Sequence, residues 1–190
     1  MQRHQSNKKQ ELSPAQQAEL IAAFRCGDKQ AFRFLYDMYE HSVYRFCRHL
    51  TGDESHARDA FQETFIRFYE HRNDLHSDNV RSWLFTIARR TCLNIIRSQR
   101  KAHDVFDEVQ HSEANMPIAD VFLREQIERA MGYLPIALRE AIILRDIEGY
   151  TYQELADIIG IDISLAKVRV YRARLHMRKL LMPIVQEHRR

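Results

Sequence analysis

Basic side chains are concentrated in two segments of this 190-residue chain. Between Val80 and His103, and again between Ser164 and Leu181, each segment holds six lysines and arginines and no aspartate or glutamate. The rest of the chain carries 17 basic residues against 26 acidic ones. Clustered guanidinium and ammonium groups attract phosphates, whereas solvated helix faces usually mix both signs. The distribution therefore predicts two separate contacts with a polyanion, and we favour nucleic acid.

Aromatic residues are interleaved with the arginines of the first basic segment, which reads Trp83-Leu-Phe-Thr-Ile-Ala-Arg89-Arg90. Proteins that bind single strands combine flat rings, on which bases stack, with cations for the backbone. Core packing would also use aromatic residues, so both interpretations of Trp83 and Phe85 stay open at this point. We expect Leu84, Ile87 and Cys92 to be core residues.

The second basic segment divides into two faces when it is drawn as a helix at 100° per residue. One stripe is apolar: Ala166, Val170, Ala173, Met177, Leu180 and Leu181. Outside the stripe lie Lys167, Tyr171, Arg172, Arg174, Arg178 and Lys179. One face can therefore pack on its own domain while the other meets a ligand.

The residues before this segment predict a helix-turn-helix. Thr151-Tyr-Gln-Glu154 is a capping box, and Gly160 permits a tight reversal after the short helix. The first residues of the second helix in such a motif enter the major groove. We expect Lys167, Val168, Tyr171 and Arg172 to reach base edges, and Arg169 and Arg174 to reach phosphates.

Residues 54–70 have the opposite character, since Glu54, Asp59 and Glu63 make this segment acidic. It should not face DNA. A basic protein surface could bind it, and an ordinary solvated face is the alternative.

Apolar residues recur at steps of three and four through most of the chain, which predicts an all-α fold. Helices are expected over about 14–26, 29–50, 54–70, 80–100, 118–132, 135–147, 152–159 and 164–182. Residues 1–12 are a polar tail, expected to be disordered, and residues 102–117 are mostly polar and acidic, as in a flexible linker. The sequence thus predicts two small helical domains, 13–101 and 118–190.

Several functional classes are disfavoured. The longest run without Lys, Arg, Asp or Glu, from Ala130 to Leu138, is too short to span a membrane, and the first 19 residues contain no apolar signal segment. Cys26, Cys47 and Cys92 are widely spaced, which favours reduced thiols in or near the core and a cytoplasmic location. We recognise no nucleophile constellation, paired carboxylates, phosphate loop or metal cluster, and so predict neither an enzyme nor a cofactor.

Three motifs resemble the extracytoplasmic-function (ECF) group of bacterial sigma-70 factors, over roughly residues 27–101 and 125–181. Asp59-Ala-Phe-Gln62-Glu63-Thr-Phe-Ile-Arg-Phe is similar to the D-x-x-Q-E-x-F-x-R of region 2.2. Trp83-Leu-Phe-Thr-Ile-Ala-Arg89 is similar to the W-L-x-x-I-A-R of regions 2.3–2.4. Three further stretches are similar to region 4 of the family: Leu134-Pro135 with Arg139-Glu140, residues 148–156 and residues 167–174.

The resemblance implies a sigma factor with a region 2 domain and a helix-turn-helix region 4 domain. Its implied partners are core RNA polymerase (β′ clamp helices and β flap), promoter DNA and an anti-sigma factor, without direct membrane insertion. The residues that would bind the β′ clamp helices are Asp59, Gln62 and Glu63. Those that would hold the separated −10 strand are Asn73, Trp83, Arg89, Arg90, Asn94 and Arg97. Those that would read the −35 duplex are Ser164, Lys167, Val168, Arg169, Tyr171, Arg172 and Arg174.

The chain departs from the family pattern at some of these positions. Arg90 stands where many members have Asn, Asn94 stands where many have Asp, and residues 164–169 read S-L-A-K-V-R rather than a form close to G-T-V-K-S-R. The promoter sequence therefore stays open, and Val168 could contact a thymine methyl group. Two alternatives also stay open: a helix-turn-helix regulator that binds a palindrome as a dimer, and a helical interaction protein without affinity for nucleic acid.

Overall fold

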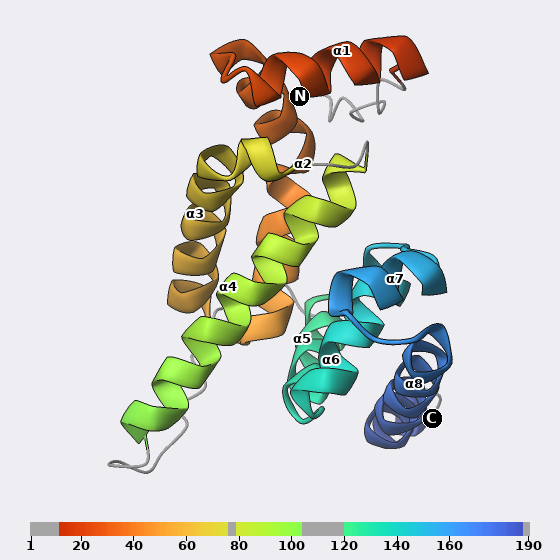
Figure 1. Ribbon diagram of the computed structural model, residues 1–190. Coiled ribbons are helices and arrows are strands. Elements are labelled where there is room, and N and C mark those ends of the chain that lie inside the picture. The colour runs from red at the N-terminus through yellow and green to blue at the C-terminus, as the bar shows by residue number, and fades with distance from the viewer. Residues whose placement is uncertain (1–11, 76–78, 104–119, 188–190) are drawn as a thin grey trace, which may run out of the picture.

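The computed structural model describes residues 12–75, 79–103 and 120–187, which form eight α-helices and no strand (Figure 1). The all-α fold expected from the sequence is confirmed for this part of the chain. The predicted polar tail, the middle of the 71–79 turn and most of the predicted linker lie outside the described residues.

The first four helices pack together as an N-terminal bundle: α1 (Pro14–Arg25), α2 (Lys29–Thr51), α3 (Glu54–Glu70) and α4 (Val80–His103). Short polar side chains begin these helices because they accept hydrogen bonds from first-turn amides. Asp28 Oδ1 accepts from the amides of Gln30 and Ala31 at 2.7 and 2.8 Å, and Asp53 Oδ1 accepts from the amide of His56 at 2.8 Å. These caps fix where α2 and α3 start.

An aromatic core holds the N-terminal bundle together. Phe24 stacks on Phe68 with ring centroids 4.6 Å apart, and Phe46 meets the edge of Phe85 at 5.3 Å. Phe85 is fully buried, as are Leu84 and Cys92, whereas Ile87 is half-buried. The core interpretation therefore holds for Phe85. Trp83 is half-buried, with its ring 5.3 Å from that of Phe68.

The cysteines follow the sequence expectation in part. Cys47 on α2 and Cys92 on α4 are buried, while Cys26 is exposed at the end of α1. A hydrogen bond with the Cys92 thiol, together with burial, raises the pKa of the Cys47 thiol well above its ordinary value. The Cys47 thiol is therefore held in the unreactive protonated form.

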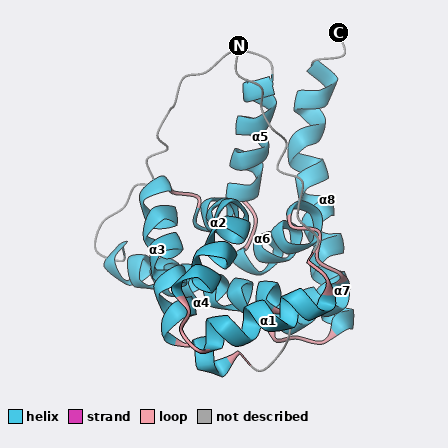
Figure 2. Ribbon diagram, turned by 90° about the horizontal axis from the view of Figure 1, so that it is seen from above, coloured by secondary structure: helices cyan, strands magenta, loops and turns pink. Residues whose placement is uncertain are grey.

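The remaining helices form a C-terminal bundle: α5 (Asp120–Gly132), α6 (Ile136–Ile142), α7 (Tyr152–Ile159) and α8 (Ile163–Glu187). Figure 2 shows α5 and α8 side by side. The helix predicted over 135–147 is α6 followed by a π-helical segment, η2 (Ile143–Ile147), in which the amide of Glu148 donates to the carbonyl of Ile143 at 2.9 Å. This wider turn sets the position of Glu148, directly after it.

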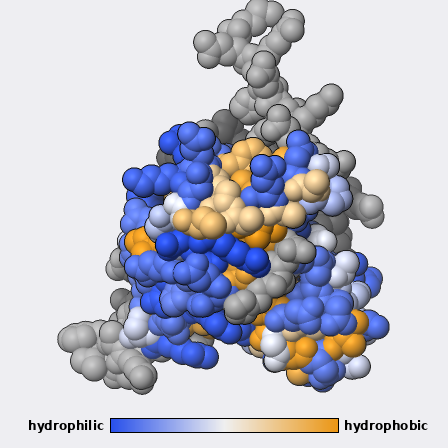
Figure 3. All heavy atoms as spheres, turned by 45° about the horizontal axis from the view of Figure 1, so that its top comes forward, coloured by the Kyte–Doolittle hydropathy of each residue, from blue (hydrophilic) through white to orange (hydrophobic). Residues whose placement is uncertain are grey.

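The two bundles pack against each other. Helix α4 contacts α7, and α2 contacts both α6 and η2 (Figure 1). The buried apolar residues of both bundles belong to one continuous cluster. On the face shown in Figure 3, hydrophilic residues predominate, and apolar residues gather in a band across the upper part and at the lower right.

Candidate nucleic-acid and protein interfaces

The predicted capping box and reversal that set up the helix-turn-helix are present. The Thr151 hydroxyl accepts from the amide of Glu154 at 3.2 Å, and the Glu154 carboxylate accepts from the amide of Thr151 at 2.8 Å. The hydrogen bond from the Thr151 amide, and after it one that the Thr151 hydroxyl donates to the same carboxylate at 2.8 Å, lower the pKa of Glu154. Gly160 ends α7 with φ 77° and ψ 47°, a left-handed conformation in which a side chain would be strained. The chain then reverses into α8.

Helix α8 presents one face to its own bundle and the other to solvent. Asp162 begins it, because Oδ1 accepts from the amide of Leu165 at 2.9 Å. The predicted inner stripe is buried at Ala166, Val170, Ala173 and Met177 and half-buried at Leu181. Leu180, predicted in the same stripe, is 38% exposed. The expected −35 residues that are exposed are Ser164, Lys167, Val168, Tyr171, Arg172 and Arg174.

Two arginines of α8 are held by acids of their own bundle. Arg174 forms a two-pronged ion pair with Asp146, with Nε–Oδ2 at 2.9 Å and Nη2–Oδ1 at 2.5 Å, and this hydrogen bonding raises the pKa of Arg174. Arg169 is half-buried, and its Nη1 donates to Glu140 Oε1 at 3.2 Å. Lys167 and Arg172 are thus more accessible to a ligand than Arg169.

Helix α4 carries a second basic face. Arg90, Asn94 and Arg97 are exposed and lie at steps of four and three, so they share one side of the helix. Trp83, two turns before Arg90, lies on the same side and is half-buried. Asn73 is exposed in the 3₁₀ turn η1 (Arg72–Asp74) before α4.

Arg89 differs from the other candidates on α4 because it points at the C-terminal bundle. Its Nε donates to Glu140 Oε2 at 2.7 Å and its Nη2 donates to Glu140 Oε1 at 3.3 Å. The side chain of Arg89 is 18% exposed, and that of Glu140 is 3% exposed. Glu140 thereby binds one arginine from each of the two predicted DNA-binding helices.

The predicted protein-binding residues lie on α3. Asp59 and Gln62 are exposed, and Glu63 is half-buried, with one oxygen accepting from Arg67 Nε at 2.5 Å. The three positions fall on one side of the helix, since residues three and four apart are neighbours. An acidic and amide-bearing face of this kind suits a basic protein surface.

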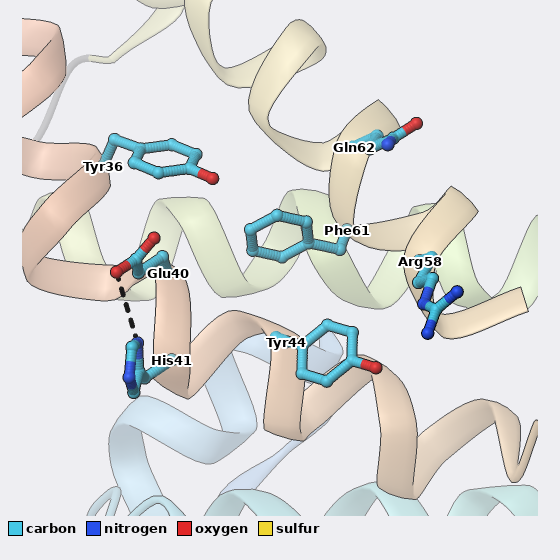
Figure 4. Close-up of a pocket in the computed structure, with 7 residues that line it drawn as sticks. All are labelled: Tyr36, Glu40, His41, Tyr44, Arg58, Phe61 and Gln62. Atoms are coloured by element: carbon cyan, nitrogen blue, oxygen red, sulfur yellow. Dashed lines mark ion pairs between the residues drawn. The ribbon is translucent and has the colours of Figure 1, made fainter. Parts of the chain in front are cut away.

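A groove of about 460 Å³ runs between α2 and α3 beside Gln62 (Figure 4). The rings of Tyr36, Tyr44 and Phe61 point toward the space between the two helices. Phe61 meets Tyr36 at 6.1 Å and Tyr44 at 5.8 Å, both edge to face. Sequence periodicity predicts Phe61 to be buried, but it is half-buried because it lines this groove.

Two buried carboxylates were missed by sequence reasoning. Glu140 and Glu148 are 2% and 6% exposed. The spacing of Glu140 could have indicated its burial. It lies four residues after Ile136 and four before Leu144, and so on the inward side of the helix. An acid in such a position needs a cationic partner, although its identity cannot be read from spacing.

Among residues 12–75, 79–103 and 120–187, we find no group of His, Cys, Asp and Glu side chains that could hold a metal ion. None of the helices in this part of the chain is long and apolar enough to cross a membrane. What the geometry defines is an all-helical protein with a helix-turn-helix, a second basic helix and an acidic face beside an aromatic groove.

Comparison with known proteins identifies the family to which this all-helical protein belongs. Residues 35–102 match Sigma-70 region 2, and residues 124–177 match Sigma-70, region 4. The RNA polymerase sigma-H factor of Pseudomonas aeruginosa is 28% identical over 191 residues, which cover 93% of this chain and 99% of that protein. The ECF RNA polymerase sigma factor SigM of Bacillus subtilis is 31% identical over 150 residues, which cover 77% of this chain and 92% of that protein.

Solved structures agree with this relationship. The sigma factor RpoE in complex with the anti-sigma factor NepR, from Bartonella quintana, has a TM-score of 0.67 and 27% identity, and the match covers 80% of this chain and 96% of that one. CnrH in complex with the cytosolic domain of CnrY has a TM-score of 0.68 at 23% identity, which supports the fold. The chain belongs to the ECF sigma factors of the sigma-70 family, which is not a class of enzymes.

Proposed function

We propose that this protein is a sigma factor that directs core RNA polymerase to promoters by reading a −35 element as duplex and holding a −10 element as single strand. The observation that carries the proposal is the pairing, in one chain, of a helix-turn-helix whose second helix exposes Lys167 and Arg172 with a separate acidic face on α3. A plain duplex reader needs the first feature and has no use for the second.

Duplex recognition is assigned to α8. Its exposed N-terminal half offers Lys167 and Arg172 for guanine or phosphate contacts, and Val168 for a thymine methyl group. Ser164 and Tyr171 complete the exposed surface. Arg169 and Arg174 stand beside this surface and would reach phosphates after releasing Glu140 or Asp146, or by using the N–H groups that these acids do not occupy.

Single-strand capture is assigned to α4 and the turn before it. Arg90, Asn94 and Arg97 form an exposed polar row for the strand, and the accessible part of Trp83 offers a surface for a base to stack on. Asn73 is exposed in the turn that precedes α4 and would contact a base that has left the stack. Contacts of this kind offset the cost of unstacking, which is a few kcal/mol.

Binding to core polymerase is assigned to Asp59, Gln62 and Glu63, with the β′ clamp helices as the partner and the β flap as a second contact for the C-terminal bundle. The aromatic groove beside Gln62 widens this face and would accept an apolar side chain from the partner. A polar row next to an aromatic pocket is a common composition for a protein interface.

Three further assignments follow from membership of this family. The protein would act in the cytoplasm, where polymerase and promoter DNA are found. It would carry no catalytic activity and need no cofactor of its own. An anti-sigma factor would hold it inactive, in line with the complex of the related sigma factor RpoE with the anti-sigma factor NepR.

A titration against bacterial core RNA polymerase, paired with run-off transcription from a random promoter library, tests the proposal. We expect tight 1:1 binding and transcripts from promoters that share one −35/−10 pair. Retention of duplex binding with no affinity for core polymerase would contradict the proposal and favour an ordinary helix-turn-helix regulator.

A further inference from the structure

The loop between η2 and α7 inserts two side chains into the N-terminal bundle. Tyr150 is 1% exposed, its ring meets the edge of Phe85 at 5.3 Å, and its hydroxyl donates to the carbonyl of Arg81 at 3.3 Å. The guanidinium of Arg81 lies over the Tyr150 ring, 4.2 Å from its centroid. Burial, the largest cause, raises the pKa of Tyr150 far above its ordinary value, so the hydroxyl stays a hydrogen-bond donor.

Glu148 docks beside Tyr150. Its Oε1 accepts from both Nε and Nη2 of Arg45, each at 2.9 Å, and its carbonyl accepts from Nη2 of Arg81 at 2.5 Å. The Glu148 side chain is 1% exposed, while that of Arg45 is 46% exposed. Both basic partners lie on the N-terminal bundle, so this carboxylate is neutralised across the interface rather than within its own bundle.

A second ion pair closes the same interface further along α4, where Arg89 binds both oxygens of Glu140. These N–H groups cannot bind a phosphate or a base while they are donated to Glu140. Helix α7 also packs over α4 in this arrangement. Docking of the bundles therefore covers part of the surface proposed for the −10 strand.

We propose that Glu148 and Tyr150 form a docking anchor, which binds the pocket around Arg45, Arg81 and Phe85 and closes the two bundles in the free protein. The closed form withholds Arg89 from single-stranded DNA, and the bundles must part before that strand can be held. The docking itself is independent of the proposed function, whereas its consequence for promoter binding rests on it.

The two buried carboxylates respond differently when the bundles part. Glu140 keeps Arg169, a partner in its own bundle at 3.2 Å. Glu148 loses both of its arginines and is left at a loop that then faces water. A substitution at Glu148 therefore acts on the closed form with little effect on the C-terminal bundle itself, whereas a substitution at Glu140 would also disturb α8. A substitution at Glu148 is therefore the more specific test of the docking contact.

The experiment compares the full-length wild type with Glu148→Lys by small-angle X-ray scattering and by stopped-flow association with single-stranded DNA that carries the −10 element. A compact chain of this length has a radius of gyration of about 16 Å. Lysine at position 148 places a third cation between Arg45 and Arg81, so we expect a larger radius of gyration. The association rate should rise by the factor by which the open fraction increases.

Glu70→Lys is the matched control, because it makes the same change of charge at an exposed position at the end of α3. It should leave the radius of gyration at the wild-type value. Arg45→Glu, on the other side of the contact, should also expand the chain, and the combined variant Arg45→Glu with Glu148→Lys should move it back toward the compact form. Retained −35 duplex binding verifies that the C-terminal bundle of each variant is folded.

Each outcome is decisive. An unchanged radius of gyration in both E148K and R45E would overturn the anchor, and so would failure of the combined variant to recover any compactness. Expansion without faster association with the single strand would leave docking in place and overturn the idea that closure withholds Arg89 from single-stranded DNA. A wild-type chain with no affinity for core polymerase would instead count against the proposed function, while the scattering result would still decide on the anchor.

Discussion

The two basic helices of this protein differ in how much of their charge is available to a ligand. On α8, Lys167 and Arg172 are exposed, and Arg169 is paired with an acid of its own bundle. On α4, Arg90 is exposed, but Arg89 is bound by Glu140 of the other bundle. Both helices come from segments with six basic residues and no acid. Their difference therefore arises from tertiary packing and not from composition.

This difference indicates an order of events. The exposed part of α8 can meet a DNA duplex without any change in the protein. The part of α4 that includes Arg89 can meet a single strand only after the bundles have separated. Duplex recognition and strand capture are then distinct steps, and variants of the two helices should affect distinct measurements.

The largest effect is expected for Arg172→Ala, which removes an exposed cation from the reading face of α8. Loss of a two-pronged contact to a base costs about 1–3 kcal/mol, so −35 affinity should fall and the base preference at one position should relax. Fluorescence anisotropy with a panel of −35 duplexes measures both quantities. Lys179→Ala, further along the same helix, is the control and should weaken all duplexes equally. Unchanged selectivity of R172A would remove Arg172 from the reading face.

A smaller loss, of about 1–2 kcal/mol, is expected when Gln62 and Glu63 on α3 are both replaced by Ala, because central interface residues contribute at this level. Binding to core polymerase should weaken while −35 duplex binding remains intact, because α3 is separate from α8, the helix that binds the duplex. Titration of both ligands on the same preparation gives the comparison. Loss of both activities would indicate misfolding rather than a lost contact.

Arg89 and Arg90, adjacent on α4, give the most direct comparison of an arginine paired across the two bundles with an exposed one. In the free chain, Arg90→Ala should reduce affinity for the single-stranded −10 strand by about 1 kcal/mol, a value typical of one charge-assisted contact. Arg89→Ala should have little effect on the free chain, because Arg89 is already committed to Glu140.

In the polymerase–promoter complex both variants should impair strand separation, which permanganate reactivity of unpaired thymines reports. Equal losses for R89A and R90A in the free chain would mean that Arg89 is accessible there and that the contrast between the two helices is smaller than the structure indicates.

Local features of the fold could be predicted from the sequence because they depend on neighbouring residues. The helix expected over 54–70 is α3 with the same bounds, and the Thr151–Glu154 capping box forms as expected. The exposed and buried sides of α8 also follow from helical periodicity, apart from Leu180 near its end. Spacing along the chain is sufficient for such features.

The contact between the bundles could not be predicted in this way. Arg45 and Glu148 are 103 positions apart, and Arg89 and Glu140 are 51 apart. Sequence patterns identify a basic face but not whether its partner is a phosphate or a carboxylate of the same chain. Sequence analysis also predicts an ordinary helix through the π-helical segment before Glu148, because its apolar residues keep a spacing that fits an α-helix.

The smallest effects concern the capping boxes of the two bundles, which share a geometry and differ in one titratable group. Ser13 caps α1 together with Gln16, and Thr151 caps α7 together with Glu154. Ser13→Ala and Thr151→Ala should each cost about 1 kcal/mol of the free energy of unfolding at neutral pH. Urea unfolding followed by circular dichroism measures this cost.

Only the α7 box should depend on pH. Hydrogen bonding lowers the folded-state pKa of Glu154 below its ordinary value of 4.5, so its contribution to stability is fully present above that value. The contribution is lost as the pH falls through the lowered pKa, where the folded protein takes up the proton. Glu154→Gln, which makes the α7 box resemble that of α1, should therefore flatten the stability profile below about pH 4.5, while S13A should keep the wild-type shape. A profile for E154Q as steep as that of the wild type would assign the acid sensitivity to other carboxylates.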